Sequence, residues 1–143
     1  MHTNKYFDTH AHLNLSAFKE DASAVAEKCA DEGVMVINVG TKESTSKRGV
    51  ELASEADNCF AIIGLHPIQS VPGYHDEDEI GEGGNPFMNG AEEFNKDFYR
   101  ELAMDEKVVG IGECGLDYWH TPEGSYETQE RNFIAQFEMA TEI

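Results

Sequence analysis

The segment that decides the fold is GVMVINVG, residues 33–40, an apolar run closed by a glycine at each end. A short apolar run without polar alternation indicates a strand that is buried on both faces. Just before it, residues 22–30 carry apolar side chains at helical spacing, which predicts a helix capped by Asp21 and stopped by Gly33. This unit is therefore a helix followed by a buried strand.

The same alternation extends outward in both directions from this unit. Further strands are expected at residues 5–12, 59–65 and 108–112, and strands alternating with amphipathic helices predict a parallel α/β sheet. The remaining helices are expected over Ser44–Ala56 with Ser44 as the cap, over a segment with Ala91, Phe94, Phe98 and Leu102 on one side, and from Ser125 onward with Tyr126, Phe133, Phe137 and Ala140 buried.

One insertion interrupts this regular spacing. Residues 75–93, HDEDEIGEGGNPFMNGAEE, carry seven acidic residues, four glycines and no lysine or arginine. We expect a surface loop here. It is either a solvated excursion or a substrate lid that attracts cations.

Composition narrows the class of protein. With 143 residues, 40% of them hydrophobic, the chain suits one soluble domain spanning residues 1–143. Ten lysines and arginines against 28 aspartates and glutamates give a net charge of −18, which excludes gripping a nucleic-acid backbone by surface charge alone. The acidity fits either a high-salt milieu or an acidic enzyme with a local positive pocket.

The chain also lacks the patterns of membrane and secreted proteins. Its longest apolar runs are too short to span a bilayer, and its first residues lack a signal-peptide pattern, so we expect a cytoplasmic protein without membrane contact. Cys29, Cys59 and Cys114 are odd in number and each lies in an apolar segment, so they are expected to be reduced core residues.

Chemistry in a parallel α/β fold gathers at the carboxyl ends of the strands. His10 and His12 end the first strand, and because side chains alternate along a strand, both point to one face and can reach one cation. Asp8 shares that face, and Glu113 brings a carboxylate to the end of the fourth strand. These residue types are metal ligands, although a surface or core histidine pair would give the same local pattern.

Three segments together resemble a known family. FDTHAH (7–12), GLHP (64–67) and GIGECGLDY (110–118) resemble the N-terminal signatures of the TatD-type metal-dependent deoxyribonucleases, which are amidohydrolase-like (β/α)8 barrels. The helix over 129–142 also resembles the fourth barrel helix of that family. The resemblance runs from Tyr6 to the end of the chain and implies the N-terminal half, (β/α)4, of such a barrel.

The resemblance also implies site roles. His10 and His12 would bind a divalent cation, and Glu113 would be the catalytic carboxylate that completes a two-metal site with Mg or Mn, or with Zn as the alternative. His66 would contact substrate, whereas Asp8 and Asp117 would orient neighbouring groups. Cys114 is expected in the core, and His2, His75 and His120 match no motif and are expected at the surface.

The expected function is hydrolysis of phosphodiester bonds, as a 3′-5′ DNA exonuclease that holds its substrate through metal ions. The alternatives are an amide or ester hydrolase with the same ligands, or a silent half-barrel that works after self-association or pairing with a complementary half. A (β/α)8 barrel takes about 250 residues, so we expect this chain to be the first part of a longer barrel and inactive by itself.

Overall fold

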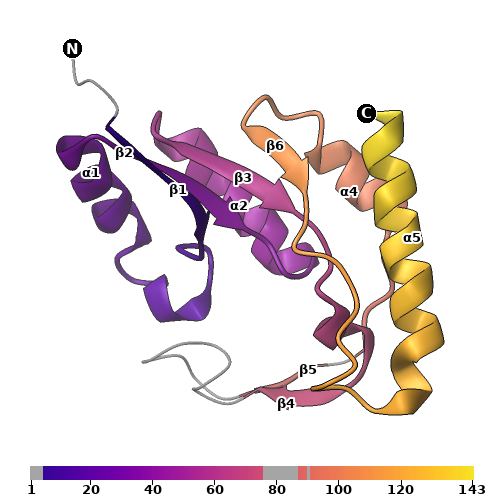
Figure 1. Ribbon diagram of the computed structural model, residues 1–143. Helices are drawn as coiled ribbons and strands as arrows, with labels where there is room; N and C mark the ends of the chain where they lie inside the picture. Colours follow the sequence, from indigo (N-terminus) through magenta and orange to yellow (C-terminus); the bar gives the residue numbers. More distant parts are fainter. Residues whose placement is uncertain (1–4, 76–86, 90) are drawn as a thin grey trace.

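The computed structural model describes residues 5–75, 87–89 and 91–143 (Figure 1). Its strands are β1 (Tyr6–Ala11), β2 (Val34–Val39), β3 (Cys59–Ile63), β4 (Gly73–His75), β5 (Phe87–Asn89) and β6 (Val108–Ile111). Its helices are α1 (Ala22–Glu32), α2 (Glu43–Glu55), α4 (Lys96–Leu102) and α5 (Tyr126–Glu142), with 3-10 turns at Ser16–Phe18, Pro67–Ser70 and Glu123–Ser125.

Four strands form one parallel sheet in the order β1-β2-β3-β6, which confirms the predicted parallel α/β architecture. Figure 1 shows the four arrows pointing the same way, so their carboxyl ends meet at one edge of the sheet. This edge carries the polar residues that the sequence analysis singled out.

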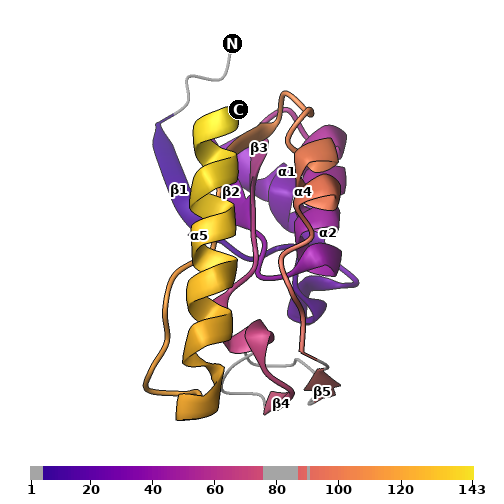
Figure 2. The same ribbon diagram turned by 90° about the vertical axis from the view of Figure 1, so that its right-hand side faces the viewer.

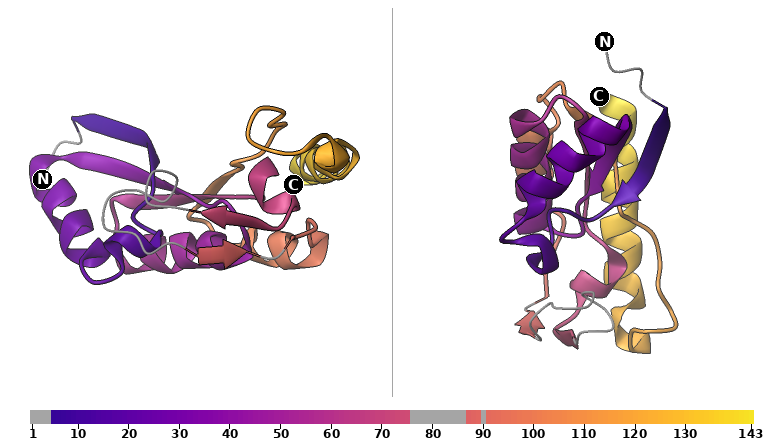
Figure 3. Two further views of the ribbon diagram at one scale, coloured as in Figure 1. Left: turned by 90° about the horizontal axis from the view of Figure 1, so that it is seen from below. Right: turned by 90° about the vertical axis from the view of Figure 1, so that its left-hand side faces the viewer.

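The two middle strands form the centre of the core. Ala61 and Ile63 of β3 have no exposed surface, and neither has Ala53 on the facing side of α2. Figure 3 (left) shows α1, α2 and α4 along one face of the sheet and α5 at the end opposite β1. The apolar run at residues 34–39 is largely buried, because a strand lies on either side of it and helices pack against it, although Val34 and Ile37 are only half-buried.

Helix α1 follows the sequence prediction, whereas the start of α2 does not. Gly33 ends α1 in the left-handed conformation, with φ of 76°. The cap of α2 is Lys42, and Ser44 lies inside the helix, so the predicted cap was wrong. The reason is Thr45, whose hydroxyl accepts hydrogen bonds from the backbone N–H groups of Thr41 and Lys42. The helix therefore begins earlier in the chain than predicted.

Helix α4 is shorter than predicted. Ala91 and Phe94 precede it, because the Asn95 side chain accepts the backbone N–H of Phe98 and thereby caps the helix. Tyr99, which the apolar pattern did not include, is the fully buried residue of this helix.

Helix α5 buries a different face from the one predicted. Its buried residues are Gln129, Asn132, Gln136 and Met139, whereas Phe137 is 63% exposed, Ala140 is exposed, and Tyr126 and Phe133 are half-buried. The prediction was wrong because it assumed that burial selects apolar side chains. Here the buried amides hydrogen-bond to backbone groups of neighbouring loops.

The acidic insertion is only partly described. β4, whose last residue begins the insertion, pairs with β5 inside it as antiparallel strands, so the expectation of a plain loop is wrong there. Residues 76–86 and 90 lie outside the described residues. His2 also lies outside them, as does the side chain of His75, and His120 is exposed as expected.

The three cysteines are free, but only Cys59 is fully buried. Cys29 is half-buried against the core. Cys114 is half-buried outside the core cluster, because it follows the end of β6 and has no paired strand beside it; its predicted core position was wrong. In the part of the chain that the structure describes, no helix is long and apolar enough to cross a membrane.

Candidate metal centre

The two histidines of the first strand lie side by side at its carboxyl end. The rings of His10 and His12 are 5.0 Å apart between centroids and meet edge to face. His12 Nδ1 lies 3.0 Å from the carbonyl oxygen of Val39, the last residue of β2. A carbonyl only accepts, so Nδ1 carries the proton and the Nε2 lone pair is free for a ligand.

Glu113 is held beyond β6 by backbone bonds to both middle strands. Its N–H donates to the carbonyl oxygen of Gly40 at 3.0 Å, and the N–H of Gly112 donates to that of Ile63 at 2.8 Å. The Gly112–Glu113 peptide bond is cis. The backbone of Gly112 passes close to that of Gly64. A Cβ on Gly64 would lie 2.5 Å from the carbonyl carbon and oxygen of Gly112, so a glycine is needed there.

These three side chains converge although they come from the two outer strands. His10 Nε2 lies 3.6 Å from Glu113 Oε2, and His10, His12 and Glu113 each offer a ligand atom within 4.8 Å of the others. Two strands separate β1 from β6, a distance of about 14 Å in a flat sheet. The sheet therefore curls so that both outer strands face the same space, and two imidazoles with one carboxylate are a donor set that suits a divalent cation.

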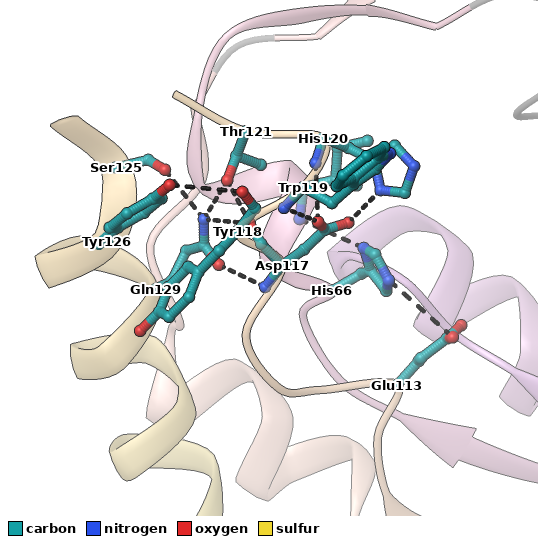
Figure 4. Close-up of polar contacts among 11 residues, drawn as sticks. His66, Glu113, Asp117, Tyr118, Trp119, His120, Thr121, Ser125, Tyr126 and Gln129 are labelled. Atoms are coloured by element: carbon teal, nitrogen blue, oxygen red, sulfur yellow. Dashed lines mark hydrogen bonds and ion pairs between the residues drawn. The ribbon is translucent and has the colours of Figure 1, made fainter. Parts of the chain in front are cut away.

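His66 lies on the same rim, at the end of the β3 segment (Figure 4). Its N–H donates to the carbonyl oxygen of Thr41 at 2.8 Å, its ring Nδ1 accepts the N–H of Ile68 at 3.2 Å, and its Nε2 lies 3.9 Å from Glu113 Oε1. Because Nδ1 is an acceptor, the proton of the neutral ring is on Nε2. Burial lowers the pKa of His66, and the nearby carboxylates of Glu113 and Asp117 oppose that shift less strongly.

The two aspartates that were expected to orient neighbours make local bonds of different kinds. Asp8 Oδ1 accepts the backbone N–H of His10 at 3.1 Å. Asp117 accepts the N–H groups of Trp119 and His120, both at 2.9 Å, and pairs with His120 Nδ1 at 2.7 Å. Burial works in the other direction, but these bonds from His120 and Trp119 hold the pKa of the Asp117 carboxyl below its usual value.

Arginine charge lies away from this cluster. Arg48 pairs with Glu51 and Glu55 on α2, Arg100 with Asp97 and Glu142, and Arg131 with Glu93. A cavity of about 730 Å³ also lies elsewhere, between α1 and α2, with Ala26, Leu52 and Asn58 among its lining residues. Neither feature adds a group to the His10–His12–Glu113 cluster.

Several supporting residues were missed by the sequence analysis. Asn14 is buried, and its amide donates to the Val39 carbonyl that also receives His12, at 3.0 Å, and to the carbonyl of Thr45 at 2.9 Å. Gln129 and Gln136 hold backbone groups near Asp117 and His66. The available signal was polar residues at helical spacing within 129–136, where a core-facing helix usually has apolar ones.

Comparisons with known proteins find relatives of this chain. The chain is 33% identical over 138 residues to the uncharacterized metal-dependent hydrolase YabD of Bacillus subtilis, covering 96% of this chain and 47% of the relative. It is 30% identical over 141 residues to the 3′-5′ ssDNA/RNA exonuclease TatD of Escherichia coli K12, covering 96% and 46%. The chain thus spans about half the length of the curated relatives it matches.

A solved structure shares the fold of this chain, and a family model matches its sequence. The crystal structure of YjjV, a TatD homologue from Escherichia coli K12, superposes with a TM-score of 0.66 at 23% identity and covers 96% of this chain and 47% of that one. The family model described as TatD related DNase matches residues 7–143. The chain therefore belongs to the TatD-related DNase family.

Proposed function

We propose that this chain is the metal-binding half of a divalent-metal-dependent hydrolase that cleaves phosphodiester bonds, with 3′-5′ exonuclease action on DNA as the activity of the complete enzyme. The observation that carries the proposal is the convergence of His10, His12 and Glu113, whose ligand atoms lie within 4.8 Å of one another. The names of relatives as exonucleases and as a metal-dependent hydrolase support the same reaction class.

We also propose that residues 1–143 supply four units of a (β/α)8 barrel. The curled sheet supports this, because the outer strands β1 and β6, which two strands separate, direct His10 and Glu113 into a common space. A barrel fragment leaves two strand edges to be covered by further units, by a second copy or by a complementary half.

His10, His12 and Glu113 would hold divalent cations, two in number and most suitably Mg or Mn, with Zn as an option that the imidazoles also accept. When bound, such ions polarise a phosphodiester and make a coordinated water more acidic. The chain's own part is to present the Nε2 lone pair of His12, whose ring is held by the Val39 carbonyl, and the carboxylate of Glu113, whose backbone N–H donates to the Gly40 carbonyl.

His66 would bind the substrate rather than a metal. Its Nδ1 is occupied by the N–H of Ile68, so Nε2–H is free to donate a hydrogen bond to a phosphate oxygen beside Glu113. With a net charge of −18 and the arginines paired elsewhere, DNA would be held through the metal site and such donors rather than through a basic surface.

Two substitutions test these roles. Glu113→Ala is expected to weaken metal affinity by more than about tenfold and to abolish turnover, because a ligand is lost. His66→Ala is expected to keep the metal and to slow turnover by about tenfold to a hundredfold, the effect of one lost hydrogen bond to substrate. Metal affinity is measured by calorimetry on the 143-residue chain, and rates on a 3′-labelled single strand with the full product of the same reading frame.

Glu138→Ala, which removes an exposed carboxylate of α5, is the matched control and is expected to change neither quantity. Full metal content and a normal rate in Glu113→Ala would overturn the proposal. Turnover of amides or carboxyl esters without turnover of DNA would transfer the same site to another substrate class.

A further inference from the structure

The helix that follows β6 carries three buried amides on one face. Gln129, Asn132 and Gln136 are spaced by three and four residues, and their exposed fractions are 0%, 7% and 1%. Figure 2 shows that the N-terminal part of α5 extends beyond the carboxyl ends of the strands, and the helix is in contact with the turn Pro67–Ser70. These amides therefore face the loops of the rim rather than the apolar core.

Gln136 pairs with both backbone groups of one residue. Its Oε1 accepts the N–H of Leu65 at 2.8 Å, and its Nε2 donates to the carbonyl of Leu65 at 3.1 Å. Leu65 lies just beyond β3 and is 1% exposed, so its backbone groups need partners inside the protein. The next residue is His66, so the two bonds between Gln136 and Leu65 hold the backbone beside the His66 side chain.

Gln129 repeats the same arrangement at the other loop. Its Oε1 accepts the N–H of Asp117 at 2.7 Å, and its Nε2 donates to the carbonyl of Asp117 at 3.1 Å (Figure 4). The same Nε2 lies 2.6 Å from the hydroxyl of Thr121 and 2.9 Å from that of Ser125. Gln129 thus holds the turn in which Asp117 pairs with His120.

Asn132, which lies between the two glutamines, bonds to the segments before and after the insertion at residues 75–93. Its Nδ2 donates to the hydroxyl of Ser70 at 2.9 Å, and its Oδ1 accepts the N–H of Phe94 at 3.0 Å. The helix therefore contacts three separate loops of the rim through three amides. Apolar side chains at these positions would leave backbone N–H and carbonyl groups buried without partners, which costs more than the hydrogen bonds themselves contribute.

We infer that Gln136 and Gln129 are positioning residues: Gln136 sets the place of His66 at the metal centre, and Gln129 independently sets the place of Asp117. The inference rests on the proposed function for the role of His66. It goes beyond that function because it assigns the geometry of the substrate contact to a helix that supplies no ligand.

The pair Gln136→Leu and Gln129→Leu tests this, since the two residues share type, helix and burial, and each pairs with both backbone groups of one loop residue. Amide hydrogen exchange on the 143-residue chain is the first measurement. Gln136→Leu is expected to reduce protection of the Leu65 amide by about tenfold or more while leaving that of Asp117 unchanged, and Gln129→Leu is expected to do the reverse.

Kinetics on the full product of the reading frame give the second measurement. Gln136→Leu is expected to raise KM for single-stranded DNA about tenfold, to leave metal affinity unchanged, and to add nothing further when combined with His66→Ala. Gln129→Leu combined with His66→Ala is expected to show independent effects. If Gln136→Leu does not fold, Gln136→Met, which keeps the side-chain length, replaces it with the same expectations.

Equal loss of protection at both amides in each variant, or additivity of Gln136→Leu with His66→Ala, would overturn the inference and leave a general packing role. Failure of the proposed function is recognised separately. The unsubstituted protein would then lack metal affinity or turnover, whereas the exchange pattern would still show whether each amide holds its own loop.

Discussion

The two middle strands and the two outer strands of the sheet differ in what holds them. β2 and β3 are mostly buried, with Ala61 and Ile63 at 0% exposure, whereas Tyr6 and Phe7 of β1 are 68% and 57% exposed and Val109 of β6 is 51% exposed. The candidate ligands nevertheless come from the outer pair, His10 and His12 from β1 and Glu113 from the end of β6.

The difference separates two tasks. The middle strands supply backbone carbonyls in fixed places, those of Val39, Gly40 and Ile63, and these receive His12, Glu113 and Gly112 respectively. The outer strands supply the side chains. Buried core residues are therefore concentrated in the middle strands, and the candidate ligands lie on strands whose placement depends on the middle pair.

The largest expected effect comes from opening the middle of the sheet. Ile63→Ala removes a fully buried side chain and is expected to cost about 2 to 5 kcal/mol of unfolding free energy, because it leaves a cavity in the core. Chemical denaturation of the 143-residue chain measures this cost. Val109→Ala, the matched change on β6, is expected to cost less than about 1 kcal/mol because that side chain is already half exposed to solvent. Equal costs for the two changes would break the distinction between middle and outer strands.

A smaller loss is expected where the middle strands meet the site. Gly64→Ala places a methyl group 2.5 Å from the backbone of Gly112, so that backbone must move, at a cost of about 1 to 3 kcal/mol. Because Glu113 follows Gly112, metal affinity should fall as well, which calorimetry would detect.

Gly124→Ala is the control for Gly64→Ala. A Cβ at Gly124 meets nothing within 4 Å, so this change is expected to leave both stability and metal affinity unaltered. Normal metal affinity in Gly64→Ala would show that the rim tolerates displacement of β6 and would weaken the link between the two strand pairs.

The smallest expected effect is the loss of stability at low pH that comes from Asp117, in the loop beyond β6. The pKa of Asp117 is lowered on folding, so its contribution to stability is present above its ordinary pKa of 3.8 and is lost as the pH falls through the lower folded value. Below about pH 4 the native protein should therefore lose stability more steeply than Asp117→Asn. Acid titration followed by the amide signals of Trp119 and His120 measures this, and identical acid profiles would contradict the assignment.

Much of the fold and of the candidate site could be predicted from local pattern. The apolar runs at residues 34–39 and 59–63 identified the middle strands, and parallel topology then placed His10, His12, His66 and Glu113 at one edge. Gly33 correctly predicted the end of α1. Both kinds of prediction succeeded because helix ends and strand burial depend largely on residues close in sequence.

Other features were decided only by tertiary structure. The buried face of α5 depends on backbone groups of Leu65 and Asp117, 71 and 12 residues away from their glutamine partners. The start of α2, by contrast, depends on a local contact that the apolar pattern does not show, that of the Thr45 hydroxyl with the N–H groups of Thr41 and Lys42. Hydrophobic periodicity indicates which side chains are buried for being apolar. It does not indicate which polar side chains are buried because a hydrogen-bond partner lies within reach.

What the sequence alone determined about this protein is the position of its four parallel strands, the edge of the sheet at which their carboxyl ends meet, and the residues proposed as metal ligands. What tertiary structure decided is how those ligands meet: the sheet curls until His10 and Glu113, from strands separated by two others, are 3.6 Å apart, and α5 turns its amides rather than its aromatic residues inward. The physical reason is that curvature and polar pairing are set by backbone groups distant in the chain, which come into contact only when the whole sheet has formed.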